Sequence, residues 1–131
     1  MAESDRAEKI TINVGIIDLG QIDLLVREGF YTNRTDFIRT AIRNQLKASG
    51  EAITETVARK TLVLGTEYYG RSDLEALQAA GRSVHIRVLG LASIGADVTP
   101  ELALATIASV EVLGAFRASP AVKAALAPRM A

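Results

Sequence analysis

Residues 9–14 alternate strictly between polar and apolar side chains, which is typical of a β-strand with one wet face and one buried face. Gly15 ends the alternation. The segment is therefore predicted to form a strand that covers a hydrophobic core with one face only. The apolar face carries Ile10, Ile12 and Val14, and the polar face carries Lys9, Thr11 and Asn13.

Two helices are predicted after this strand. The first is expected to begin at Asp18, with Gln21 completing a capping box, and to end at Gly29. The second is expected to begin behind the N-cap Thr32 and to run to about Ser49. Both have apolar residues three and four positions apart, as on the buried face of an amphipathic helix. These residues are Ile22, Leu25 and Val26 in the first helix and Phe37, Ile38, Ala41, Ile42 and Leu46 in the second.

One strand and two helices cannot bury a core alone, because so short a chain has too little interior. The strand also has no partner within the segment. Two copies solve both problems if their strands pair antiparallel and their four helices intertwine. We therefore expect residues 1–50 to form a homodimer whose core contains Ile10, Ile12, Val14, Ile22, Leu25, Phe37, Ile38, Ala41 and Ile42.

The segment KITINV, the helix ending in EGFY and the helix start TNRTDFIRTAIRNQL resemble the ribbon-helix-helix family of bacterial regulators, of the Arc, MetJ and CopG type. The resemblance covers residues 1–50. It implies a two-stranded antiparallel ribbon in the major groove of double-stranded DNA and a phosphate anchor at the start of the second helix. The implied base contacts are Lys9, Thr11 and Asn13, and the implied phosphate contacts are Thr32, Asn33, Arg34 and Thr35.

The chemistry of these residue types fits the resemblance. Lysine donates to guanine, asparagine can bond adenine bidentately, and threonine offers polar or methyl contact. A helix N-terminus attracts phosphate through its unpaired amides and its dipole. Two other interpretations stay open. The polar strand face is, in an arbitrary protein, usually only a solvated surface, and Arg34 could form a surface salt bridge with Asp23 or Asp36.

A tetrapeptide of the form x-V-L-G recurs in the rest of the chain, at residues 62–65, 87–90 and 111–114. Each copy is followed by a helix-start signal: Ser72 with Glu75, Thr99 before Pro100, and Ser119 before Pro120. Gly81 is expected to close the first of these helices, and Gly90, Gly95 and Gly114 to lie at strand ends and turns. The motif is short and could recur by chance, but the regular caps favour a repeat.

Residues 51–131 are therefore predicted to form a small α/β module of order βαβαβα that oligomerises or binds an effector. The fold class of the whole chain is expected to be α+β, with an N-terminal βαα unit, residues 1–50, before this module.

The charges are balanced. The chain has 15 basic and 15 acidic residues, and its formal net charge is zero. Residues 1–50 hold seven of each sign, which leaves eight of each for the rest. The balance argues against a protein that binds nucleic acid by bulk positive charge, although a local basic surface stays open. DNA affinity would instead rest on a few placed groups and on several dimers bound side by side.

Several kinds of chemistry are excluded or disfavoured. The chain has no cysteine and a single histidine, His85, so we expect neither disulfides nor a metal site within one chain. A lone histidine is more often a packed or surface residue than a ligand. Tyr68 and Tyr69 could line a pocket, but adjacent tyrosines usually divide between core and surface. No catalytic motif stands out, so we expect no enzyme and no cofactor.

The leading hypothesis is a sequence-specific DNA-binding transcriptional regulator of the repressor type, which occludes its operator as a homodimer or a higher homo-oligomer. The alternatives are an antitoxin whose tail neutralises a toxin, and a scaffold or filament protein that uses its N-terminal segment only to dimerise. The polar N-terminus and the absence of an apolar run of about 20 residues predict a cytoplasmic protein with no membrane partner.

Overall fold

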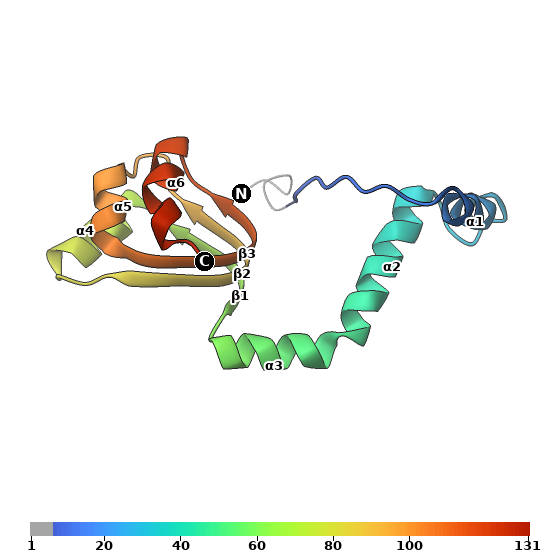
Figure 1. The fold of residues 1–131 in the computed structure, drawn as a ribbon, viewed down its shortest axis with the longest axis horizontal. Helices are drawn as coiled ribbons and strands as arrows, with labels where there is room; N and C mark the ends of the chain where they lie inside the picture. Colours follow the sequence, from blue (N-terminus) through green and yellow to red (C-terminus); the bar gives the residue numbers. More distant parts are fainter. Residues whose placement is uncertain (1–6) are drawn as a thin grey trace. The chain divides into compact units, whose positions relative to one another are not determined.

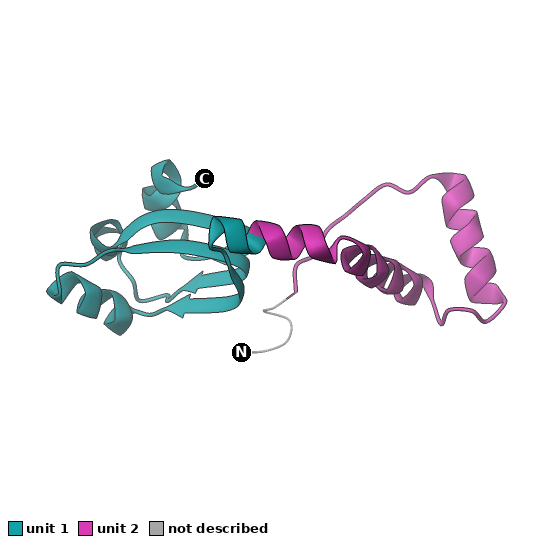
Figure 2. Ribbon diagram, turned by 90° about the horizontal axis from the view of Figure 1, so that it is seen from below, with its two compact units in different colours: residues 1–6, 57–131 teal, residues 7–56 magenta. Residues whose placement is uncertain are grey.

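The computed structural model describes residues 7–131, which form two compact units (Figure 2). Residues 7–56 make one unit, and residues 57–131 make the other. The first contains α1 (Ile16–Arg27), α2 (Arg34–Ala48) and the start of α3 (Gly50–Lys60). The second contains the end of α3 and an alternation of strands and helices (Figure 1). The fold is thus mixed α and β, as expected.

The strand predicted over residues 9–14 is not confirmed. Residues 7–15 form neither helix nor strand in the single chain, and all of them are exposed. The physical reason is that a ribbon strand needs the backbone N–H and C=O groups of a neighbouring strand, and the described part of the chain pairs no strand with residues 9–14.

Helix α1 begins earlier than predicted. Its N-cap is Gly15, and Asp18 lies inside the first turn, where a carboxylate favours the helix dipole. Its predicted end at Gly29 is confirmed. Gly29 has φ +85°, and the amide of Phe30 reaches back to the carbonyl of Leu25 at 3.0 Å. This pairing closes the helix with a Schellman motif, which requires the left-handed backbone that glycine adopts without strain.

Helix α3 was not predicted from the sequence. The second helix ends at Ala48 with the C-cap Ser49, close to the predicted end, but Gly50 directly begins α3. Glycine lowers helix stability mainly in a helix interior, and its cost at a helix start is small.

The second unit holds a three-stranded parallel sheet in the order β1-β2-β3. Strands and helices alternate in the order that the repeat predicts. They are β1 (Val63–Tyr69), α4 (Arg71–Ala79), β2 (Val84–Ile94), α5 (Pro100–Thr106), β3 (Ile107–Arg117) and α6 (Pro120–Leu126), before the 3-10 turn η2 (Ala127–Arg129).

Most of the cap predictions in this unit are confirmed. The Thr99 and Ser119 side chains accept the amides of Leu102 and Val122, each at 3.2 Å, and a proline follows each cap. Gly81 follows the last turn of α4 with φ +66°. The Ser72 capping box is wrong: α4 begins behind Gly70, whose amide donates to the Asp73 carboxylate at 2.9 Å.

The three x-V-L-G copies lie in register across the sheet. Val63 pairs with Val88 and Val88 with Val112, and two residues on, Gly65 pairs with Gly90 and Gly90 with Gly114. We call these three glycines the glycine column. Their φ angles are +135°, +141° and +119°. Gly90 and Gly114 therefore lie inside strands, and not at the strand ends and turns where the sequence suggested them.

A side chain on the glycine column would have no room. A Cβ atom on Gly90 would overlap the carbonyl oxygen of Gly65, and a Cβ atom on Gly114 would overlap that of Gly90. The column thus lets three bent strands approach at ordinary sheet spacing.

Helices α4, α5 and α6 pack on one face of the sheet (Figure 1) and bury one hydrophobic core. The alternation along β2 decides which residues enter it. Ile86 and Val88 are fully buried, whereas His85 and Arg87 are exposed. The two tyrosines divide as expected: Tyr69 packs against the core and Tyr68 is exposed. The helices contribute Leu74, Leu102, Ala103, Val122 and Leu126 to the core.

Candidate nucleic-acid interface

The three predicted base contacts lie on the extended segment before α1. Lys9, Thr11 and Asn13 are all exposed, and their alternate neighbours Ile10 and Ile12 are exposed by 77% and 67%. This segment is neither helix nor strand in the single chain, so base reading by these side chains stays a prediction.

The first unit has no interior of its own. Among residues 7–56, no side chain is buried. Of the predicted dimer core, Ile22, Leu25 and Phe37 are half-buried between the helices. The others are exposed: Ile10, Ile12, Val14, Ile38, Ala41 and Ile42. The unit thus leaves more apolar side chains exposed than a small soluble unit usually does.

The start of α2 is built around Asn33, not around Thr32 as predicted. The Asn33 side-chain oxygen accepts the amide of Asp36 at 2.8 Å, and the Asp36 carboxylate accepts the amide of Thr32 at 2.9 Å. This is a reciprocal capping arrangement. The spacing of an asparagine and an aspartate three residues later could have identified it from the sequence.

The backbone amides of the first two residues of α2 remain open. Those of Arg34 and Thr35 have no hydrogen-bond acceptor in the described part of the chain. Both belong to the first turn of a helix of 15 residues, where the dipole favours an anion. The amides of Thr32 and Asp36 are occupied by the cap, so they cannot serve the same purpose.

Arg34 forms a bidentate ion pair with Asp23 of α1. Its Nε and Nη2 atoms each donate to a carboxylate oxygen at 2.8 Å, and both side chains are about half exposed. The hydrogen bonds lower the pKa of the Asp23 carboxyl and raise the pKa of the Arg34 guanidinium. Of the two partners that the sequence left open, the structure therefore selects Asp23.

The ion pair fixes the position of the guanidinium without using all of it. A guanidinium has five N–H donors, and the carboxylate of Asp23 accepts from two of them. The Tyr31 and Phe37 rings, with centroids 5.0 Å apart in an edge-to-face arrangement, join the turn after α1 to the first part of α2. Arg34 is thus placed at the start of α2 with donors left for a further acceptor.

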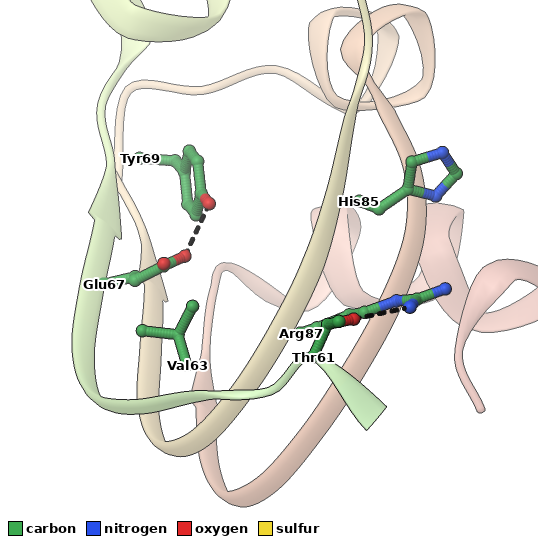
Figure 3. Close-up of a pocket in the computed structure, with 6 residues that line it drawn as sticks. All are labelled: Thr61, Val63, Glu67, Tyr69, His85 and Arg87. Carbon is green, nitrogen blue, oxygen red and sulfur yellow. Dashed lines mark hydrogen bonds between the residues drawn. The ribbon is translucent and has the colours of Figure 1, made fainter. Parts of the chain in front are cut away.

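A second candidate site is an open cavity of about 380 Å³ beside β1 and β2, lined by Thr61, Val63, Glu67, Tyr69, His85 and Arg87 (Figure 3). Its polar groups bond one another. The Tyr69 hydroxyl donates to Glu67 at 2.6 Å, and Arg87 donates to Thr61 at 3.1 Å. Burial is the main cause that raises the pKa of the Tyr69 hydroxyl, and the hydrogen bond to the Glu67 carboxylate is the second.

His85 pairs with Ser109 at 2.7 Å and is exposed, as expected for a surface histidine. Among residues 7–131, no group of three acidic or histidine side chains could hold a metal ion.

Comparison with known proteins gives one match. A family model, described as the Ribbon-Helix-Helix transcriptional regulator family, matches residues 5–123. The match includes α1 and α2 and continues through β3 into α6, so it covers both units. Neither the curated proteins nor the solved structures contain a match to this chain. In the described part of the chain, no helix combines the length and the apolar character needed to cross a bilayer.

Proposed function

Because the chain belongs to the ribbon-helix-helix transcriptional regulator family, we propose that it is a sequence-specific DNA-binding repressor that covers its operator as a homodimer. The observation that carries the proposal is the first unit itself. Residues 7–56 expose alternating apolar side chains on an extended segment, and they place two open amides and a guanidinium at one helix start.

The dimer accounts for the apolar surface. Two extended segments that pair antiparallel supply each other with backbone partners and turn Ile10, Ile12 and Val14 onto the helices below. The opposite face of the ribbon then carries Lys9, Thr11 and Asn13 from both copies. A two-stranded ribbon fits the major groove, where each of these side chain types can contact base edges.

The start of α2 accounts for orientation on the DNA. A phosphate oxygen bound by the amides of Arg34 and Thr35 would lie at the positive end of the helix dipole. The remaining donors of Arg34 would add charge-assisted hydrogen bonds. Such contacts fix the register of the ribbon but carry no sequence information.

The direct test is a gel-shift titration of the full chain on DNA from its own promoter region. We expect binding that weakens as salt rises and that resists competition by unrelated DNA of equal length. Absence of binding at low salt, with a folded dimer confirmed by sedimentation, would contradict the proposal.

The role of Arg34 can be separated from its ion pair. Arg34→Ala is expected to weaken binding to operator and unrelated DNA alike, and to lower the salt slope by about one for each copy. The measurement is log affinity against log salt for both DNA sequences. The paired control is Asp23→Ala, which removes the same ion pair but leaves the guanidinium free for phosphate.

The two variants distinguish a DNA contact from a structural tie. If Arg34 binds phosphate, Asp23→Ala keeps or strengthens DNA binding while Arg34→Ala weakens it. If the ion pair only joins α1 to α2, both variants lose affinity equally, and Arg34 must be withdrawn as a phosphate contact.

A further inference from the structure

The parallel sheet of the second unit has two edge strands, β1 and β3, because β2 is the central strand. An edge strand presents unpaired N–H and C=O groups that can pair with another chain. Both edges carry a large exposed apolar residue next to the glycine column: Leu64 on β1 is 68% exposed, and Leu113 on β3 is 52% exposed.

The C-terminal residues cover only part of the β3 edge. Met130 forms a parallel bridge with Val110, and the amide of Ala131 donates to the carbonyl of Val110 at 2.9 Å. Val112, two residues later, is the position in register with Val88 and Val63. Residues 112–116 of β3, beyond these C-terminal contacts, have the same register as residues 63–67 of β1.

The two ends of the glycine column have complementary shapes: open space at Gly65 and a backbone carbonyl at Gly114. Each of Gly90 and Gly114 lacks a Cβ atom where the glycine carbonyl of the preceding strand lies. Gly65 has the same backbone, with φ +135°, but no atom lies within 4 Å of the corresponding position. At the other end of the column, the carbonyl of Gly114 has no fourth glycine beside it. The open space at Gly65 thus has the shape that a carbonyl of a preceding strand would fill.

We propose that second units of different copies join head to tail, with β3 of one copy paired in parallel with β1 of the next. The occupant of the β1 edge, and of residues 112–116 on the β3 edge, is a second copy of this chain, in the register that places Leu113 beside Leu64 and Gly114 beside Gly65. The joint continues the sheet by the same step that relates β1 to β2 and β2 to β3.

The joint places an acidic side chain of one copy near a basic side chain of the next. In this register, the Glu111 carboxylate of one copy lies beside Leu62 of the next, two residues from Lys60. Within one chain, the Lys60 ammonium already reaches Glu111 at 3.4 Å across the sheet. The joint thus brings a carboxylate to an edge that carries an ammonium.

Head-to-tail contacts differ from those of a two-fold dimer in their outcome. They use two different surfaces, so they propagate into rings or open arrays and do not stop at two copies. Antiparallel pairing of β1 with itself would leave the β3 edge unpaired. The inference does not depend on DNA binding, since it concerns the second unit alone.

The chain has no cysteine, so engineered cysteines can test the joint without background. The double variant Leu64→Cys with Leu113→Cys, in the full chain under mild oxidation, is expected to give a ladder of disulfide-linked multimers on a non-reducing gel. Paired strands lie about 4.8 Å apart, which suits a disulfide. Within one chain the two positions are two strands apart, about 10 Å, which is too far.

Two controls make the result decisive. The double variant Leu64→Cys with Leu104→Cys carries its second cysteine on α5, at a residue that is 40% exposed, and is expected to give no ladder. Leu64→Cys alone is expected to remain uncrosslinked. A covalent dimer from Leu64→Cys alone indicates pairing of β1 with itself and overturns the proposal, as does an uncrosslinked Leu64→Cys with Leu113→Cys variant.

A second measurement covers the case in which oxidation is slow. The unmodified chain is expected to sediment as species larger than a dimer, and Leu64→Lys to reduce the mass to that of the dimer, because a lysine on an edge strand opposes pairing. Leu104→Lys is the matched control and is expected to leave the mass unchanged. A chain that sediments as no more than a dimer at its highest soluble concentration overturns the proposal.

Discussion

Replacement of Gly90 by alanine is expected to unfold the second unit or to lower its free energy of unfolding by about 4 kcal/mol. Two causes add. The φ angle of +141° is strained for any residue with a Cβ atom, and that atom would overlap the backbone carbonyl of Gly65, which cannot rotate away as a side chain could. A loss of this size is a large part of the stability of an ordinary domain.

The measurement is thermal unfolding followed by circular dichroism, with Gly65→Ala as the matched variant. Gly65 has nearly the same φ, but its Cβ atom would meet nothing within 4 Å, so only backbone strain of about 1–3 kcal/mol is expected. Both variants are compared at a concentration where sedimentation shows no species above the dimer. Equal losses in the two variants would show that the carbonyl overlap contributes nothing.

Simultaneous replacement of Thr11 and Asn13 by alanine is expected to lower operator affinity at least a hundredfold, while the dimer persists. Each good contact to a base edge discriminates by about 1–3 kcal/mol, and a dimer loses both contacts twice. Binding to unrelated DNA at low salt is expected to change little, because it depends on phosphate contacts and not on base edges. Gel-shift titrations on operator and unrelated DNA measure the two effects separately.

The control has the same change in composition at sites away from the extended segment. Thr54→Ala with Asn44→Ala removes one threonine and one asparagine from exposed positions on α3 and α2. This variant is expected to bind the operator like the unmodified chain. If the Thr11 and Asn13 variant also keeps its operator affinity, the polar face of the ribbon does not read bases.

The sequence predicted correctly those helix ends that depend on one or two neighbouring residues. The caps at Thr99 and Ser119 needed only a hydroxyl before a proline, and the end of α1 needed only Gly29. The start of α2 was placed one residue too early because Thr32 and Asn33 are both good caps. Asp36 decides between them. Its amide donates to the Asn33 side chain, and its carboxylate accepts the amide of Thr32.

Other features depend on contacts that no single segment contains. The pattern over residues 9–14 identifies two faces, but a strand forms only when a second strand is present. The spacing of x-V-L-G indicates a repeat, but neither the register of the glycine column nor its positive φ angles follow from spacing. They arise because three bent strands must pack side by side. The family assignment from residues 1–50 is confirmed by the family match.

The glycine column also makes each strand, together with its helix, an equivalent structural repeat. Since every copy enters the sheet in the same register and bends at the same residue, the sheet could lengthen by duplication of one whole repeat in the gene, without redesign of its neighbours. A duplicated copy would need its glycine most of all, whereas its exposed face would be free to diverge. The second unit is thus a scaffold that evolution can extend by whole repeats, as its present copies, spaced by 25 and 24 residues, illustrate.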